Sequence, residues 1–283
     1  MVLELIFWVC IFGVGYAYLG YPLLLAAIGR GGDRRDAGGE GPRQWPSLTV
    51  LVAARNEARR LAAKLDDVLA QDYPADRLQV IVVSDGSTDD TAAIASGYAA
   101  RGVECIELRD KVGKETAQAR GITAARGEVL VFTDVATRIG GAGLRGMAAA
   151  FQSASVGAVS SEDRFVTADG RPAGEGLYVR YEMWLRQLES RARGLVGLSG
   201  SLFAVRRELC DEWPADVPSD FVVALRCARR GLKAERGGVK SSAPGDAEKL
   251  GTDAKVVERR RRRAPERARA GVGRLAHDAS AVH

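Results

Sequence analysis

The sequence has little histidine and cysteine, the residue types that most often bind zinc or form cross-links. It contains two histidines and four cysteines among 283 residues, and no two cysteines form a Cys-x-x-Cys pair. A zinc site built from these residues is therefore not expected. The cysteines are scattered rather than arranged as a disulfide framework, so we expect reduced thiols and a cytosolic compartment.

Charge of one sign is not in large excess either. The apolar content of 46% and the charged content of 27% are those of an ordinary globular protein with one large domain or two small ones. The formal net charge of +5 is modest, and we expect no nucleic-acid partner. The positive charge is uneven, because Arg259 to Arg263 form an unbroken run. This run is either a solvated basic tail or a contact for diphosphate or anionic lipid.

The N-terminal stretch lacks charge almost completely. Val2 to Ile28 contains one charged residue, Glu4, and about 20 apolar residues suffice to cross a bilayer as a helix. A cleaved signal peptide would need a basic segment before the apolar one, and no Lys or Arg precedes it here. We therefore predict a single retained transmembrane helix over residues 1–29. Arg30, Arg34 and Arg35 follow it, which predicts a cytoplasmic location for the remainder.

Beyond an exposed linker at residues 30–46, apolar runs of strand length alternate with amphipathic segments. This alternation is typical of βαβ units with a mostly parallel sheet flanked by helices. We assign residues 47–240 to this α/β domain and predict no strand beyond about residue 240. Residues 241–283 form a basic tail with the composition of a disordered or truncated segment. Strands are predicted over 48–54, 78–83, 103–108, 128–132, 156–161 and 195–205, and helices over 56–71, 88–101, 116–126, 141–151, 174–193 and 219–230.

Polar or acidic residues follow three of the predicted strands at their carboxyl ends. Asn56 and Glu57 follow the first strand, Asp85 the second and Asp134 the fourth. The carboxyl ends of parallel strands meet at the edge where open α/β sheets bind ligands. Acids there are unfavourable unless a ligand or a metal compensates them, and Mg²⁺ and Mn²⁺ prefer carboxylates together with phosphate oxygens. The pattern predicts a nucleotide-diphosphate site with Asp134 as metal ligand; for Asp85 alone, a capped loop is the alternative.

Four motifs occur in a fixed order along this part of the chain. They are Asn56-Glu57, Ser84-Asp85-Gly86-Ser87-Thr88-Asp89, Gly113-Lys114 and Phe132-Thr133-Asp134-Val135-Ala136. Together they resemble the motifs of family 2 glycosyltransferases, which are inverting enzymes of the Rossmann-like GT-A fold and include the membrane-bound cellulose and hyaluronan synthases. The resemblance covers roughly residues 47–233.

The resemblance implies a nucleotide-sugar donor, usually a UDP-sugar, and Mg²⁺ or Mn²⁺ as cofactor. Asp85 would contact the nucleoside, and Asp134 would match the first acid of the D-x-D metal motif. Asn56 and Glu57 would belong to the donor site. Lys114 would pair with phosphate, or would be a solvated surface lysine.

The later part of the chain would then supply the catalytic base and the acceptor site. The resemblance assigns the base to Asp220, whose alternative role is to complement the dipole at the start of a helix. Glu162 and Asp163 end a predicted strand and could touch the acceptor or lie in a solvated loop. Gly200 and Ser201 could allow close approach of an acceptor chain, or could serve packing alone.

The sequence departs from the family pattern at several positions. Ser84 stands where an acid is common, Ala119 where an asparagine is common, and Ala136 where D-x-D has its second acid. The Gln-x-x-Arg-Trp motif of membrane-bound relatives and a second apolar span do not occur. Asp134 is therefore expected to bind metal with fewer protein ligands than usual.

Three functions remain open from the sequence. The first is a membrane-anchored, inverting glycosyltransferase that acts on a saccharide or lipid acceptor. The second is a transferase that loads sugar onto a polyprenyl phosphate. The third is a catalytically silent, membrane-tethered protein that binds nucleotide sugars. A nucleotidyltransferase is disfavoured, because Ala53 to Glu57 lacks the Gly-rich, basic loop usual in such enzymes.

Overall fold

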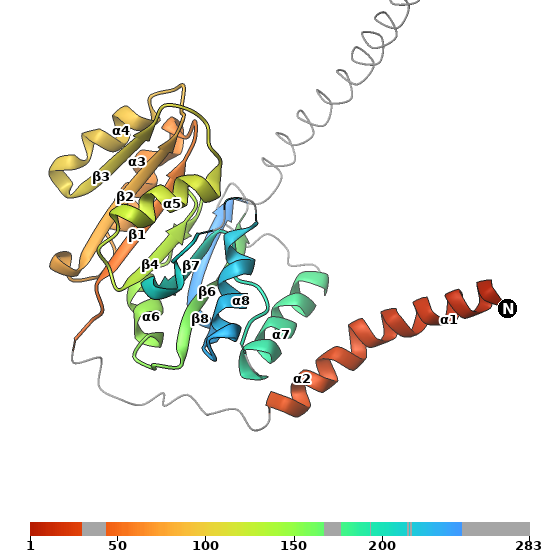
Figure 1. The fold of residues 1–283 in the computed structure, drawn as a ribbon. Helices are drawn as coiled ribbons and strands as arrows, with labels where there is room; N and C mark the ends of the chain where they lie inside the picture. The colour runs from red at the N-terminus through yellow and green to blue at the C-terminus, as the bar shows by residue number, and fades with distance from the viewer. Residues whose placement is uncertain (30–43, 167–176, 193, 214, 216, 245–283) are drawn as a thin grey trace, which may run out of the picture. The chain divides into compact units, whose positions relative to one another are not determined.

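The computed structural model describes residues 1–29, 44–166, 177–192, 194–213, 215 and 217–244. Its centre is an eight-stranded sheet with the order β3-β2-β1-β4-β7-β6-β8-β5, covered by helices (Figure 1). The predicted α/β fold with a mostly parallel central sheet is thereby confirmed. Most of the predicted linker, and the basic tail beyond residue 244 with Arg259 to Arg263, lie outside the described residues.

The first half of the sheet is parallel, as the alternating pattern predicted. Strand β1 lies between β2 and β4, and β2 also pairs with β3. In this register Val52 lies opposite Thr133 and Ala54 lies opposite Ser84. The residues that follow these strands therefore come out at one edge of the sheet. The elements are β1 (Leu48–Ala54), α3 (Ala58–Leu69), β2 (Leu78–Asp85), α4 (Thr91–Gly97), β3 (Val103–Leu108), α5 (Lys114–Ala124) and β4 (Val129–Thr133).

The second half of the sheet adds antiparallel strands. Strand β7 pairs with β4, β6 pairs with β7, and β5 pairs with β8, each in antiparallel orientation. Because β7 runs against β4, the start of β7 lies beside the end of β4. The elements are β5 (Arg138–Ile139), α6 (Gly143–Ala150), β6 (Val156–Val166), α7 (Leu177–Ala192), β7 (Leu202–Arg206), α8 (Ser219–Arg229) and β8 (Lys233–Pro244), with short 3₁₀ turns at Ala75–Arg77, Ala99–Arg101 and Arg207–Leu209.

Two boundaries differ from the prediction in ways that matter for the site. Strand β8 extends to Pro244, although the sequence after residue 233 has little apolar periodicity. The extension of β8 depends in part on a small residue. A methyl group on Gly237 would lie 2.7 Å from the side chain of Val159, so the backbone of β8 approaches Val159 closely at this position. Strand β6 continues to Val166, so the prediction that Glu162 and Asp163 end a strand is wrong.

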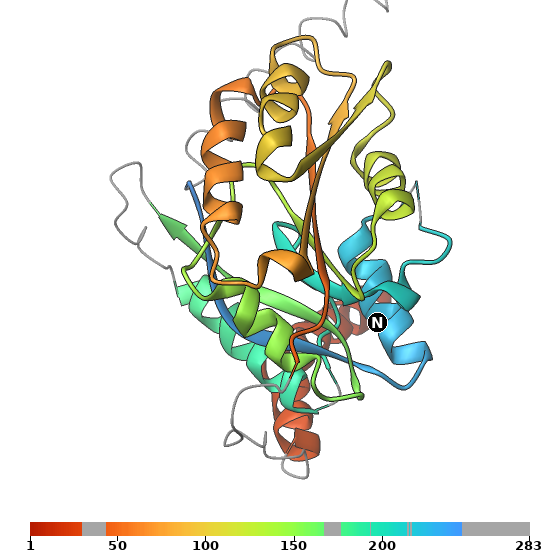
Figure 2. The ribbon, with the colours of Figure 1, turned by 90° about the vertical axis from the view of Figure 1, so that its left-hand side faces the viewer.

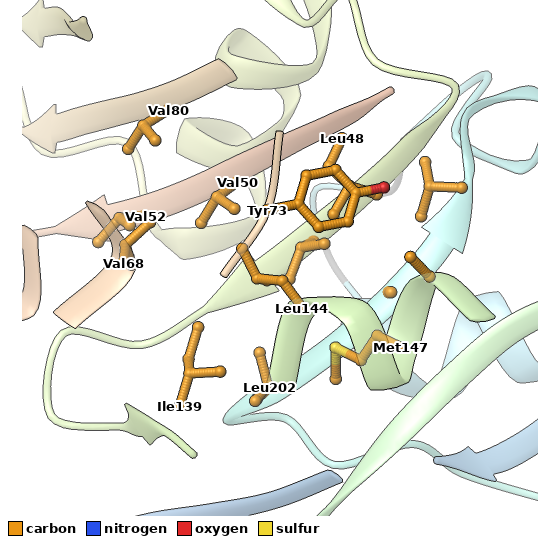
Figure 3. Close-up of a cluster of buried hydrophobic side chains, with 14 of the residues drawn as sticks. Leu48, Val50, Val52, Val68, Tyr73, Val80, Ile139, Leu144, Met147 and Leu202 are labelled. Carbon is orange, nitrogen blue, oxygen red and sulfur yellow. The ribbon is translucent and has the colours of Figure 1, made fainter. Parts of the chain in front are cut away.

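The core lies on both faces of the sheet, because successive residues of each strand point to opposite sides. Val50 and Val52 face one cluster, which includes Leu144 and Met147 of α6 (Figure 3). Leu65 of α3 belongs to the same cluster. Leu51 faces the other cluster, which is completed by residues of α5 and α8. Figure 2 shows α3 and α4, in orange and gold, on the opposite side of the sheet from α5 and α8. Both layers leave the carboxyl edge of the parallel strands open for loops.

The N-terminal segment forms one apolar helix in three parts, α1 (Val2–Gly15), the π-helical turn Tyr16–Gly20 and α2 (Tyr21–Gly29). It is long and apolar enough to cross a membrane, with a mean hydropathy of 2.0, and this conclusion rests on length and composition alone. Its end contacts α7: the Tyr21 hydroxyl donates to Glu189 at 3.0 Å, and the Tyr181 hydroxyl donates to the carbonyl of Tyr18 at 3.0 Å.

We expect Gly127→Ala to destabilise the protein by at least about 2 kcal/mol, because overpacking against backbone cannot be relieved by a rotamer change. A methyl group on Gly127 would lie 2.5 Å from the backbone nitrogen of Thr49. Urea unfolding measures the free energy of unfolding. Gly97→Ala is the matched control, since nothing lies within 4 Å of its added methyl group. Equal stability of the two variants would contradict the described approach of β1 to residue 127.

Candidate active site

Asp85 ends β2 and fixes the loop that leads into α5. Its carboxylate is only 5% exposed and accepts hydrogen bonds from the backbone nitrogens of Val112 and Gly113, at 2.7 and 3.1 Å. The loop passes so close to the turn after β2 that a methyl group on Gly86 would lie 2.5 Å from the nitrogen of Lys111. Charge-assisted bonds of this kind are the stronger hydrogen bonds in proteins. Asp85 therefore fixes the position of the backbone at Gly113, directly before Lys114, the first residue of α5.

The predicted motif Asn56-Glu57 meets the loop after β2. The side-chain oxygen of Asn56 accepts from the Thr88 backbone nitrogen at 2.8 Å, and the Asn56 nitrogen donates to the Ser87 hydroxyl at 3.2 Å. Asn56 has a φ of 55°, a left-handed conformation that asparagine tolerates better than most residues. Ser84, which replaces an acid of the family pattern, donates to the Ser87 hydroxyl at 2.9 Å. The two motifs thus hold each other in place.

The starts of α3 and α4 are tied together in the same way. The nitrogen of Glu57 donates to the Thr91 hydroxyl at 2.8 Å, and the nitrogen of Ala58 donates to the Asp89 carboxylate at 3.2 Å. Asp89 also accepts hydrogen bonds from the hydroxyl and the nitrogen of Thr91. The Thr91 hydroxyl is the main cause that lowers the pKa of Asp89 below its ordinary value. Asp89 therefore remains a carboxylate that joins the two loops.

Lys114 joins the loop after β3 to the end of β4. Its ammonium donates to Asp134 Oδ1 at 2.7 Å and to the carbonyl of Gly200 at 3.1 Å. The backbone nitrogen of Asp134 donates to the carbonyl of Ser201 at 3.0 Å, which continues the contact between β4 and β7. The side chains of Lys114 and Asp134 are 41% and 38% exposed, so both ends of the ion pair are accessible to a ligand.

Asp220 lies in the first turn of α8 and faces the same place. A methyl group on Gly200 would lie 3.4 Å from Asp220 Oδ2, so the carboxylate stands directly beside that residue. The carbonyl oxygen of Gly200 in turn accepts a hydrogen bond from the ammonium of Lys114. The structure therefore brings the predicted residues Asp85, Lys114, Asp134, Gly200 and Asp220 to one edge of the sheet. Their chemical roles remain predictions.

The two predicted acceptor acids have other surroundings. Glu162 lies inside β6 and forms an ion pair with Arg236 of β8 at 2.7 Å. The hydroxyl of Ser241 also donates to the carbonyl of Glu162, at 3.4 Å. Glu162 is therefore occupied in joining two strands. The side chain of Asp163 lies outside the described part of the structure.

A buried lysine beneath the Asp134 loop was not predicted. Lys64 of α3 is fully buried, and its ammonium donates to the Thr133 hydroxyl at 2.9 Å and to the carbonyl of Thr137 at 2.6 Å. Burial lowers the pKa of Lys64 from 10.5 to about 8, against the opposite effect of Asp67, 3.9 Å away. The position shared the apolar face of α3 with Leu61 and Val68, and this sequence signal could have identified it.

The same helix holds the rest of the loop after β4. The Asp67 carboxylate accepts from the backbone nitrogen of Ile139 at 2.9 Å. The side-chain nitrogen of Gln71 donates to the carbonyl of Ile139 at 3.1 Å. Together with Lys64, these side chains fix the loop that carries Asp134 from below. The carboxylate that the sequence predicted as a metal ligand therefore stands on a well-supported turn.

The donor set suits a metal that is shared with a ligand. Among the described residues, no three His, Cys, Asp or Glu side chains come together in a way that could hold an ion by themselves. Mg²⁺ and Mn²⁺ commonly use one or two carboxylates and complete their shell with phosphate oxygens and water. The partly exposed carboxylate of Asp134 fits that arrangement and does not fit a closed protein cage.

Exposed apolar side chains lie beside the proposed base. Phe221 and Leu225 are each 50% exposed and lie four residues apart in α8, and Val217, which is 42% exposed, lies two residues before the helix begins. Residues four apart share one side of a helix, so Phe221 and Leu225 form an exposed apolar pair on the helix that carries Asp220. An exposed apolar surface of this kind at a polar site can contact an apolar part of a ligand.

Comparison with known proteins gives concordant results. A model of the family described as "Glycosyl transferase family 2" matches residues 49–213, more than half of the chain. A 4,4'-diaponeurosporenoate glycosyltransferase of Staphylococcus aureus is 39% identical over 90 residues, which make up 31% of this chain and 23% of that protein. The matched part thus spans about a quarter of the curated relative.

Two solved structures with the same fold contain a nucleotide or a nucleotide sugar together with Mn²⁺. The mannosyltransferase PcManGT from Pyrobaculum calidifontis, in complex with GDP-Man and Mn²⁺, is 28% identical with a TM-score of 0.66, over 82% of this chain and 66% of that one. GalNAc-T7, solved with UDP, GalNAc and Mn²⁺, is 14% identical with a TM-score of 0.57, over 71% of this chain and 43% of that one. The second likeness shows the fold alone.

The variant Lys64→Met tests whether Lys64 is buried, because burial makes the free energy of unfolding depend on pH. The pKa of about 8 in the folded protein lies below the ordinary 10.5, so the unfolded chain binds more protons between these values. The free energy of unfolding of the wild type should therefore rise, relative to Lys64→Met, by up to about 3 kcal/mol between about pH 7 and pH 10.5.

Urea unfolding of both proteins across this range measures the difference. Lys111→Met, which removes an exposed lysine, is the control and should leave the difference between variant and wild type constant with pH. A constant difference for Lys64→Met as well would show that Lys64 is solvated.

Proposed function

The chain belongs to glycosyl transferase family 2, and from this premise we propose that it is a membrane-anchored, inverting glycosyltransferase. It would move a sugar from a nucleotide-diphosphate donor to a saccharide or lipid acceptor. The observation that carries the proposal is the position of the Lys114 ammonium, which bridges Asp134 and Gly200 beside Asp220. One small region thus contains a cation, a potential metal ligand and a potential base.

The donor would bind at the carboxyl ends of β2 and β4. We assign the nucleoside to the region of Asp85 and the motif Asn56-Glu57, and the diphosphate to Lys114 and Asp134. A Mg²⁺ or Mn²⁺ ion held by Asp134 would neutralise the negative charge that develops on the leaving diphosphate. UDP-sugars are the first donors to test, and the likeness to PcManGT, solved with GDP-Man and Mn²⁺, adds GDP-mannose.

Asp220 would act on the acceptor. Its carboxylate would take the proton from an acceptor hydroxyl while the hydroxyl oxygen forms a bond to the anomeric carbon of the donor sugar. The bond between that carbon and the diphosphate breaks in the same step, and the electron pair leaves with the nucleoside diphosphate. A single displacement inverts the anomeric configuration. The acceptor would approach Asp220 beside Gly200, where the absence of a side chain leaves the carboxylate uncovered by that residue.

The exposed apolar side chains of Phe221 and Leu225 in α8, with Val217 just before the helix, favour an acceptor with an apolar part. This supports a second candidate function, transfer of the sugar to a polyprenyl phosphate or another lipid. The curated relative from Staphylococcus aureus is named as a glycosyltransferase of 4,4'-diaponeurosporenoate. The N-terminal helix would keep the enzyme at the membrane, as in the membrane-bound branch with cellulose and hyaluronan synthases, with the catalytic domain in the cytoplasm.

Asp220→Asn tests the reaction. The amide cannot take up a proton, so transfer should fall by at least about 100-fold, within the usual contribution of a general base. Donor binding should persist, because Asp220 is not assigned to the donor. Transfer is measured by release of nucleoside diphosphate from a panel of UDP- and GDP-sugars with Mn²⁺, and binding by the rise in thermal stability that a ligand of the native state produces.

Asp211→Asn is the matched control, because it removes an exposed carboxylate from the loop between β7 and α8. It should transfer sugar at the rate of the wild type. Undiminished transfer by Asp220→Asn would rule out Asp220 as the base. A wild type that binds a donor but neither transfers nor hydrolyses it would support the catalytically silent alternative.

The membrane proposal has its own test. The full chain should sediment with membranes and resist extraction by alkaline carbonate, because about 20 apolar residues suffice to span the bilayer. A chain without residues 1–29 should be largely extracted. A reporter fused to the C-terminus should lie in the cytoplasm, and a reporter signal from the opposite side would overturn the proposed orientation.

A further inference from the structure

The ion pair between Lys114 and Asp134 occupies one of the two carboxylate oxygens that a metal could use. The Lys114 ammonium lies 2.7 Å from Asp134 Oδ1. A divalent ion binds a carboxylate oxygen at about 2.0–2.1 Å in the case of Mg²⁺. The two cations would then be only a few ångströms apart on one carboxylate, and their mutual repulsion would oppose joint binding. Ala136 provides no second carboxylate to which either could move.

We propose that Lys114 and the divalent ion are alternative counter-ions of Asp134, and that donor binding exchanges one for the other. The Lys114 ammonium passes from Asp134 to the diphosphate of the donor, and the metal takes its place at the carboxylate. Metal and nucleotide therefore bind as a unit, and metal alone binds weakly. This inference rests on the proposed function, because it requires a diphosphate ligand.

The backbone around Lys114 is built to permit such a movement. Asp85 holds the preceding residue, Gly113, through a backbone hydrogen bond of 3.1 Å, so the start of α5 stays in place. The lysine side chain has a flexible four-carbon stem and a compact charge, and it can turn without movement of the backbone. Its position is accessible, since the side chain is 41% exposed. Only the ammonium has to change partners.

The contacts of the ammonium also limit the strength of the pair. Exposed ion pairs contribute little to stability, so the Lys114–Asp134 contact is easily exchanged. The second acceptor is the neutral carbonyl of Gly200, which a diphosphate oxygen, carrying negative charge, would outcompete. The ion pair therefore neutralises the charge of Asp134, and it is weak enough for a diphosphate to attract the Lys114 ammonium away.

The test measures Mn²⁺ binding to the full-length protein by the loss of the electron paramagnetic resonance signal of free Mn²⁺, with and without UDP or GDP. Lys114→Gln should bind Mn²⁺ alone roughly three- to tenfold more tightly than the wild type, because the competing cation is gone. The same variant should bind the nucleotide with Mn²⁺ about tenfold more weakly, since a charged contact to phosphate is lost. The two shifts have opposite directions.

Three further variants make the result specific. Lys114→Arg retains the charge and should bind Mn²⁺ alone as weakly as the wild type. Arg120→Gln removes an exposed charge from the same helix and should leave both affinities unchanged. Asp134→Asn, combined with Lys114→Gln in one protein, should abolish the tight Mn²⁺ binding that Lys114→Gln shows by itself.

The outcomes separate the two proposals. Mn²⁺ binding by Lys114→Gln that is equal to or weaker than that of the wild type overturns the exchange, even where nucleotide binds. A second outcome is that Lys114→Gln gains Mn²⁺ affinity as expected, but neither the wild type nor any variant binds the nucleotide. This result supports Lys114 as the competing counter-ion, and it overturns the transfer of Lys114 to a diphosphate and the proposed donor site.

Discussion

The candidate site depends on the hydrogen bonds between the Asp85 carboxylate and the backbone of the loop before α5. Asp85 uses both oxygens to hold the nitrogens of Val112 and Gly113, and so fixes the loop between β3 and α5 against the end of β2. Without this contact, Lys114 would begin from an undefined position and its bridge to Asp134 and Gly200 would be lost. Asp85 is buried, and a buried carboxylate is tolerable only when hydrogen bonds compensate it. The loop supplies those bonds, so each part stabilises the other.

The parallel half of the fold could be predicted because its sequence signals are local. Continuous apolar runs such as Val129 to Phe132 mark strands buried on both faces, and the polar residues after them mark the binding edge. The strand after Lys233 escaped prediction because its fit depends on small residues, such as Gly237, packed against a distant strand. Pairing of β7 against β4 likewise depends on contacts between segments far apart in the chain.

The residues of the site divide in the same manner. Asp85 and Asp134 lie at the carboxyl ends of strands, Asp220 lies at the start of a helix, and Lys114 follows the glycine of a motif, so the order of these features along the chain indicated a shared location. Lys64 could not be assigned a role from its motif, because it lies inside a helix and acts on residues about 70 positions later. Its partners, the Thr133 hydroxyl and the Thr137 carbonyl, are known only once α3 is packed under the loop. Glu162 is the opposite case: the sequence made it a candidate for acceptor binding, but its carboxylate forms an ion pair with Arg236.

The contact between α2 and α7 has a consequence for how substrates are found. Hydrogen bonds from Tyr21 to Glu189 and from Tyr181 to Tyr18 join the apolar helix to the domain that carries Asp220. If that helix is embedded in lipid, these contacts hold the proposed site close to the surface of the bilayer. An acceptor that lies in the same bilayer would then reach the site by lateral diffusion, which is a search in two dimensions instead of three.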